Sequence, residues 1–241
     1  MTTELVLLPL GVVAGALTQR VTGIGFALVC APLLVLVAGP FDGVVLANLL
    51  GLIVSLVVFV AHWRDTEWRR GLLLAVPALV AIPLGAWVAR TVAPAPLMVV
   101  IGSLVIVALG AVVLSTRARV LKGTRGAVVA GGASGFMNVT AGVGGPAIVL
   151  YAVSTDWEHR KFVATFQFYS IFTNVASLVA KGGLPHIGTT ALLVSLGALA
   201  VGLLGGEVLS RHVDHAAARR LAIGLALTGA CFTVVKGVLS W

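Results

Sequence analysis

The chain has 241 residues, of which 59% are hydrophobic and only 10% are charged. Soluble domains carry about 25% charged and about 45–50% apolar residues, so this composition excludes a water-soluble enzyme and indicates a protein embedded in a lipid bilayer. The 16 basic residues outnumber the 8 acidic ones, but they lie mainly in short loops between apolar runs. That pattern is typical of membrane orientation and argues against a nucleic-acid partner.

The first 38 residues predict a re-entrant helical hairpin over residues 5–38. Apolar runs cover residues 5–20 and 24–38, and each is shorter than the roughly 20 residues that a helix needs to cross the hydrocarbon. A polar, glycine-rich break, TQRVTGIG, separates them. Irregular backbone survives at membrane depth only where it is buried in protein or lines a watery cavity, so we expect this break near the bilayer midplane. The first ten residues resemble no cleavable signal peptide, and we expect them to stay in the mature protein.

The rest of the chain predicts three spanning helices, a linker, a second hairpin and three more spanning helices. The second hairpin again consists of two short apolar runs around a polar, glycine-rich break, NVTAGVGGP. The predicted ranges are 43–62, 71–90 and 96–116 for the first helices, 117–125 for the linker, 126–155 for the hairpin, and 162–181, 188–211 and 221–239 for the last helices.

The basic residues predict the orientation of these segments. If both hairpins return to their own side, twelve basic residues share one side against three on the other, whereas hairpins that cross once would give nine against six. The twelve are Arg64, Arg69, Arg70, Arg117, Arg119, Lys122, Arg125, Arg160, Lys161, Arg211, Arg219 and Arg220, and the three are Arg90, Lys181 and Lys236. We therefore expect the linker in the cytoplasm and both termini on the outer side of the membrane.

The two halves, residues 1–116 and 126–241, share the same order of elements. A shift of 119 residues places Gly23 on Gly142, Gly25 on Gly144, Gln19 on Asn138 and Asn48 on Gln167. Three crossings per half is an odd number, so the second half is expected to be inverted relative to the first, as in many secondary transporters. The predicted fold class is an all-α polytopic membrane protein of two inverted repeats. The alternative is two halves that share only their hydropathy.

The two breaks are the candidate substrate site. In each hairpin the second helix begins at the break, where free backbone N–H groups and the helix dipole favour an anion. Glycine lets a ligand approach the backbone closely; the alternative is that these glycines only permit tight helix packing. The candidate substrate-binding residues are Gln19, Arg20, Thr22, Gly23, Gly25, Asn48, Asn138, Thr140, Gly142, Gly144, Gly145 and Gln167.

Two charged residues inside the predicted membrane segments have further candidate roles. Arg20 suits an oxyanion because its planar guanidinium matches the oxygen atoms of a sulfonate or phosphate. Alternatively it reaches a water-filled vestibule or pairs with a carbonyl. Glu207 is the one acid in a spanning run and the candidate for proton coupling. Alternatively it forms a local ion pair with Arg211, four residues further on.

Two stretches resemble the paired glycine-rich signatures of the TauE/SafE sulfite-exporter family. The first is TGIGFALVCAPLL at residues 22–34 and the second is TAGVGGPAIVLY at residues 140–151, followed by the basic stretch EHRKF at residues 158–162. The first stretch has Phe26 where a further glycine often stands. The resemblance covers nearly the whole chain. It implies a bacterial inner-membrane permease that exports sulfite or a short organosulfonate.

Other functions remain as alternatives. A membrane-embedded enzyme acting on a lipid pyrophosphate would need clustered acids near the midplane, whereas Glu207 stands alone. A permease for another small anion or for a metal ion is a further alternative, although no histidine or thiolate cluster favours a metal. Cys30 and Cys231 lie in separate segments, without the spacing of a disulfide or metal site. We therefore expect a transporter and not an enzyme, without cofactors, with a small oxyanion as substrate and a homo-oligomer as one possible assembly.

Overall fold

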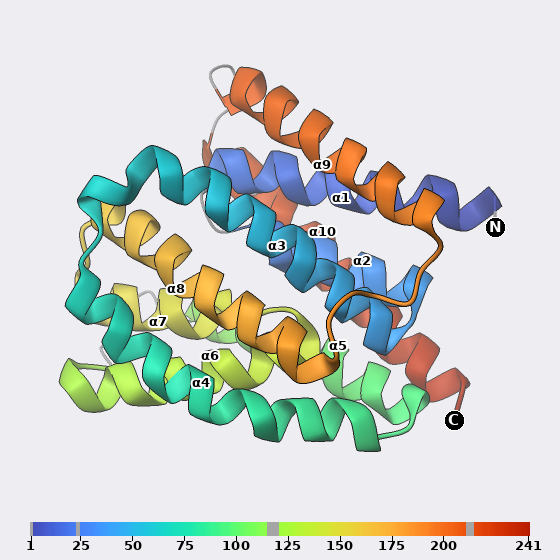
Figure 1. The fold of residues 1–241 in the computed structure, drawn as a ribbon, viewed down its shortest axis with the longest axis horizontal. Coiled ribbons are helices and arrows are strands. Elements are labelled where there is room, and N and C mark those ends of the chain that lie inside the picture. Colours follow the sequence, from blue (N-terminus) through green and yellow to red (C-terminus); the bar gives the residue numbers. More distant parts are fainter. Residues whose placement is uncertain (1, 23–24, 115–120, 211–214) are drawn as a thin grey trace.

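The computed structural model of the chain describes residues 2–22, 25–114, 121–210 and 215–241. Every regular element in these ranges is a helix, which confirms the predicted all-α class (Figure 1). The helices are α1 (Thr2–Thr22), α2 (Phe26–Ala38), α3 (Pro40–His62), the short 3-10 helix η1 (Trp63–Asp65), α4 (Trp68–Thr91), α5 (Pro94–Leu114), α6 (Gly123–Ala141), α7 (Gly145–Ser154), α8 (His159–Lys181), α9 (Thr189–Ser210) and α10 (His215–Leu239).

Six helices are long and apolar enough to cross a membrane, namely α3, α4, α5, α8, α9 and α10. They correspond to the six predicted spanning runs. The apolar parts of α1, α2 and α7 are shorter, as expected for hairpin arms. Helix α6 begins within the predicted linker 117–125, because the Gly126 N–H donates to the Lys122 carbonyl oxygen at 3.0 Å and so closes a helical turn there.

A glycine in the left-handed conformation ends α6 at the second break. Gly142 has φ +72°, and its N–H donates to the Asn138 carbonyl oxygen at 2.9 Å. This conformation is strained for residues with a Cβ atom. Helix α7 then begins at Gly145, with Pro146 in its first turn, where no N–H is needed. The sequence TAGVGGP therefore encodes both the end of one helix and the start of the next.

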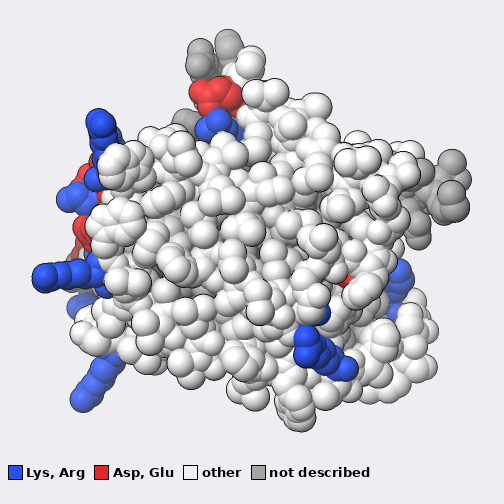
Figure 2. All heavy atoms as spheres, in the orientation of Figure 1, with Lys and Arg blue, Asp and Glu red and all other residues white. Residues whose placement is uncertain are grey.

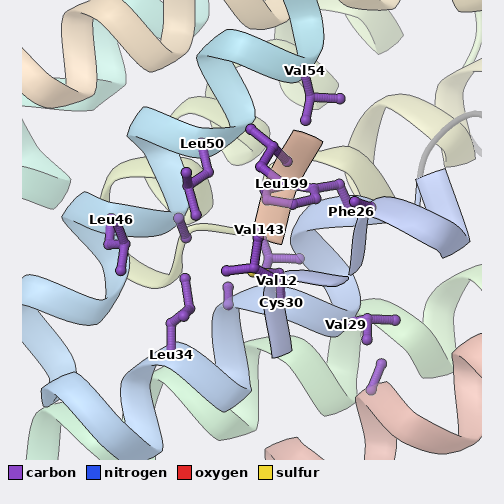
Figure 3. Close-up of a cluster of buried hydrophobic side chains, with 14 of the residues drawn as sticks. Val12, Phe26, Val29, Cys30, Leu34, Leu46, Leu50, Val54, Val143 and Leu199 are labelled. Carbon is purple, nitrogen blue, oxygen red and sulfur yellow. The ribbon is translucent and has the colours of Figure 1, made fainter. Parts of the chain in front are cut away.

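The two halves pack across one another. Helix α4 lies on α6 and α9 lies on α1, while α3 packs against α8 and α5 against α10. Figure 3 shows Val143, from the connection between α6 and α7, among buried side chains of the first half such as Phe26 and Leu50. The tip of the second hairpin is therefore inserted into the first half of the protein.

The surface fits a protein that lies in a bilayer. On the face drawn in Figure 2, lysine and arginine side chains lie mainly toward the ends of the molecule. Large apolar side chains on the helices are open to the surroundings, among them Val80, Val179 and Leu204, each at least 73% exposed. Both termini lie at one end and the α3–α4 connection lies at the other (Figure 1). This arrangement is that of a multi-pass membrane protein.

Candidate substrate site

A small cavity lies where the two hairpins meet α3 and α8. Its volume is about 50 Å³, several times the roughly 10–15 Å³ that admits one water molecule, so it suits a small ion. Its walls include six of the predicted site residues. The lining residues are Gln19, Phe26, Ala27, Leu28, Ala47, Gly51, Val54, Ser55, Asn138, Gly142, Gly144, Gly145, Phe166, Gln167, Tyr169, Ser170, Thr173 and Asn174.

Many of these lining residues form pairs that are 119 positions apart. The pairs are Gln19 and Asn138, Phe26 and Gly145, Ala47 and Phe166, Gly51 and Ser170, Val54 and Thr173, and Ser55 and Asn174. The same offset relates the two breaks. The cavity is therefore built from matching positions of the two halves, with different side chains at those positions.

The tip of the second hairpin is held by a chain of hydroxyl groups. The Tyr169 hydroxyl donates to Ser134 Oγ at 2.7 Å, and Ser134 Oγ donates to the Gly144 carbonyl oxygen at 2.6 Å. The residue before α7, Gly144, has no side chain that could cap the helix. The first backbone N–H groups of α7 have no partner inside the helix and carry partial positive charge. The tip is thus held in place, and the start of α7 faces the cavity at Gly145.

The three glycines at this tip have different surroundings. A Cβ atom on Gly144 would lie 2.8 Å from Ser134 Oγ, and one on Gly142 would lie 3.2 Å from the Ala31 Cβ atom. Packing therefore accounts for these two glycines. A Cβ atom on Gly145 would meet only Phe166 Cζ, at 3.6 Å. Gly145 is the glycine of this tip where space remains for a ligand.

The tip of the first hairpin has a different arrangement. The Gln19 side-chain oxygen accepts a hydrogen bond from the Phe26 N–H at 3.0 Å, which caps the start of α2. Phe26 itself lines the cavity and is buried. Gly25 precedes α2 but is not part of the lining. Gly23 and the side chain of Thr22 lie outside the described residues.

Helix α8 supplies most of the polar wall. Ser170, Thr173 and Asn174 line the cavity. The Asn138 amide group donates to Asn174 Oδ1 at 3.2 Å and to Ser177 Oγ at 3.1 Å, which fixes α6 against α8. These polar side chains recur at intervals of three or four residues, the spacing of one helix face. Ser170 and Thr173 are not among the predicted site residues, although this spacing in the sequence could have identified them.

Besides Gly25, three described residues that were predicted for the site lie outside the lining. Thr140 Oγ1 donates to the Gly85 carbonyl oxygen on α4 at 3.4 Å. Asn48 is 1% exposed on α3, and neither polar atom of its side chain has a partner among the described residues. The Arg20 Nη1 atom lies 3.4 Å from Glu207 Oε2 on α9. The ion pair that the sequence predicted for Glu207 involved Arg211, which is outside the described residues.

Sequence comparison assigns the chain to a known family. The family model described as Sulfite exporter TauE/SafE matches residues 7–233, which is nearly the whole chain. No curated protein and no solved structure gives a significant match. Within the described residues, no three side chains of His, Cys, Asp or Glu lie close enough together to hold a metal ion.

Proposed function

Because the chain belongs to the TauE/SafE family of sulfite exporters, we propose that it is a secondary transporter that exports sulfite or a short organosulfonate. Family membership implies a membrane transporter of sulfur anions rather than an enzyme. The choice of substrate, the outward direction and the location in a bacterial inner membrane are parts of our proposal. The twelve-to-three distribution of basic residues supports cytoplasmic loops and periplasmic termini.

The main support for the proposal is the start of α7, where Gly145 leaves space for a ligand beside the polar residues of α8. Backbone N–H groups near Gly145 can donate to anion oxygens, and Ser170 lines the same cavity with its hydroxyl group. Thr173 also lines it, but its hydroxyl group donates to the Tyr169 carbonyl oxygen at 3.3 Å. A site of neutral donors binds an anion without a fixed counter-charge, so release remains easy. We expect affinity in the millimolar to micromolar range, which corresponds to about 4–8 kcal/mol.

We further propose that the cavity lies at the centre of two inverted repeats, residues 1–116 and 126–241. The paired lining positions support this proposal. The helix packing supports it too: a shift of 119 residues places α1 on α6 and α4 on α9, and α4 packs on α6 as α9 packs on α1. In such transporters one repeat rocks against the other around a fixed site. The anion would then face the two sides of the membrane in turn.

Arg20 and Glu207 are proposed to act together, as an ion pair. They connect α1 to α9, and their side chains are 28% and 48% exposed. Glu207 is the candidate proton carrier, because protonation would remove its attraction for Arg20 and loosen this contact. Arg20 then acts on the anion through the field of its charge rather than as a contact, because the cavity lining does not include it.

Flux into proteoliposomes tests the proposed function. Purified protein is reconstituted, and the entry of sulfite, sulfoacetate, taurine and sulfate is compared with that in protein-free vesicles. We expect sulfite or sulfoacetate to enter fastest, each inhibiting the other. Equal, slow entry of all four solutes with and without protein would contradict the proposal.

A further inference from the structure

Lys181, at the end of α8, is a buried cation without a hydrogen-bonding partner. The residue is 4% exposed, and its Nζ atom has no partner among the described residues. The ammonium lies over the ring of Phe41, 4.8 Å from the ring centre. The sequence predicted Lys181 as the last residue of the spanning helix 162–181, which α8 confirms. Burial of an unpaired charge is costly, so a function is needed to explain it.

The surrounding charges leave this cation available. Asp42 and Arg90 are both near enough to act on it electrostatically. The Oδ1 atom of Asp42 accepts a hydrogen bond from the His186 N–H at 2.8 Å and lies 3.3 Å from His186 Nδ1. That carboxylate oxygen therefore joins the start of α3 to the α8–α9 connection. Lys181 and Arg90 therefore share this region with one carboxylate, which is already engaged by His186.

Lys181 lies in line with the cavity wall. Ser170, Asn174, Ser177 and Lys181 follow one another at intervals of four, three and four residues, which places them on one face of α8. The first two line the cavity, and Ser177 accepts a hydrogen bond from Asn138. At a rise of about 1.5 Å per residue, Lys181 lies about 10 Å beyond Asn174 along the helix. The polar face thus runs from the cavity toward the end of α8.

Topology does not explain the charge. Lys181 is one of only three basic residues on the side opposite the basic loops, and that side disfavours lysine and arginine when it is periplasmic. We propose that Lys181 is a second contact for the anion, on the route between the cavity and the end of α8. This inference rests on the proposed transport of a sulfur oxyanion. In this proposal the Lys181 ammonium helps the anion to pass along the route and does not hold it in the cavity.

The test compares Lys181→Met and Lys181→Arg with the control Lys236→Met. Lys236 is exposed toward the same side, and its Nζ donates to the Leu36 carbonyl oxygen at 2.8 Å. Sulfite affinity at equilibrium, initial sulfite flux and thermal stability are measured for each variant. We expect Lys181→Met to lower flux at least tenfold, with affinity within threefold of wild type and a melting temperature that is unchanged or higher. Lys181→Arg should recover at least a third of the flux, and Lys236→Met should stay within twofold.

Two results would overturn the inference. One is wild-type flux in Lys181→Met, which would show that the anion does not need this charge. The other is a joint fall of stability, affinity and flux in that variant, which would show that Lys181 only supports the fold. Failure of the proposed function is a different result, because the wild-type protein itself would then move neither sulfite nor a sulfonate, and the inference would fall with it.

Discussion

The two hairpins present their second helices to the cavity in different ways. In the first, the Gln19 side-chain oxygen accepts a hydrogen bond from the Phe26 N–H, and the buried Phe26 side chain lines the cavity. In the second, the matching residue Asn138 donates to α8, and Gly145 leaves the start of α7 open. A helix N-terminus is therefore a ligand site only where its own chain does not already satisfy it.

The cavity walls formed by α3 and α8 also differ in polarity, and again the second half is the more polar one. At positions related by the offset of 119, α3 contributes Gly51 and Val54 where α8 contributes Ser170 and Thr173. Thr173 donates to its own helix, so Ser170 is the member of these two pairs that offers a hydroxyl donor on the side of the second half. We therefore infer that the second half binds the anion while the first half encloses it, although both halves line the cavity.

Gly145→Leu should have the largest effect. The new side chain would extend from an open position into the cavity beside Phe166, so we expect sulfite affinity to fall at least 100-fold, with Gly145→Ala intermediate. The control is Gly197→Leu on α9, where an added Cβ atom would meet nothing within 4 Å. Calorimetric titration in detergent measures affinity, and size-exclusion chromatography verifies folding. Unchanged affinity in Gly145→Leu would remove the start of α7 from the site.

Ser170→Ala should have the next largest effect, because it removes a hydroxyl donor from the polar wall. A hydrogen bond to a charged group contributes about 1.5–3 kcal/mol, so we expect the Kd for sulfite to rise roughly tenfold or more. Ser55→Ala removes a hydroxyl from the opposite wall, on α3, and its effect should be at least fivefold smaller. Equal losses in the two variants would show that the anion is held from both sides.

Gln19→Leu should affect stability more than binding. It leaves the buried Phe26 N–H without its acceptor, which costs about 1–2 kcal/mol. For a chain of this size we expect the melting temperature to fall by roughly 2–8 °C, with sulfite affinity within threefold of wild type. A thermal unfolding scan with and without sulfite measures both quantities. A loss of affinity comparable to that of Gly145→Leu would make the first hairpin an equal partner in binding.

Thr140→Val should have the smallest effect. Its hydroxyl donates to Gly85 on α4 at 3.4 Å, away from the cavity lining. We expect a loss of about 1 kcal/mol or less in the free energy of unfolding and sulfite affinity within twofold of wild type. An affinity loss of tenfold would show that Thr140 turns toward the anion in another state of the transporter.

The sequence predicted the six spanning helices, because segment length and hydropathy alone decide them. It placed the two breaks too early, because α1 and α6 remain helical as far as Thr22 and Ala141. It did not separate Gly145 from Gly142 and Gly144, since the direction of a Cβ atom depends on packing across helices. It also could not find the contact between Arg20 and Glu207, which come from opposite halves of the chain. The sequence shows polar residues of α8 at the spacing of one helix face, but it does not show that this face is turned toward the hairpin tips.

A crystal structure with bound selenite tests the central claim most directly. Selenite has the shape and charge of sulfite, and the anomalous signal of selenium locates it without ambiguity. The account predicts one selenium position in the cavity, with an oxyanion oxygen about 2.7–3.2 Å from the Gly145 backbone nitrogen and further from Phe26. A selenium position at the start of α2, or outside the cavity, would contradict it.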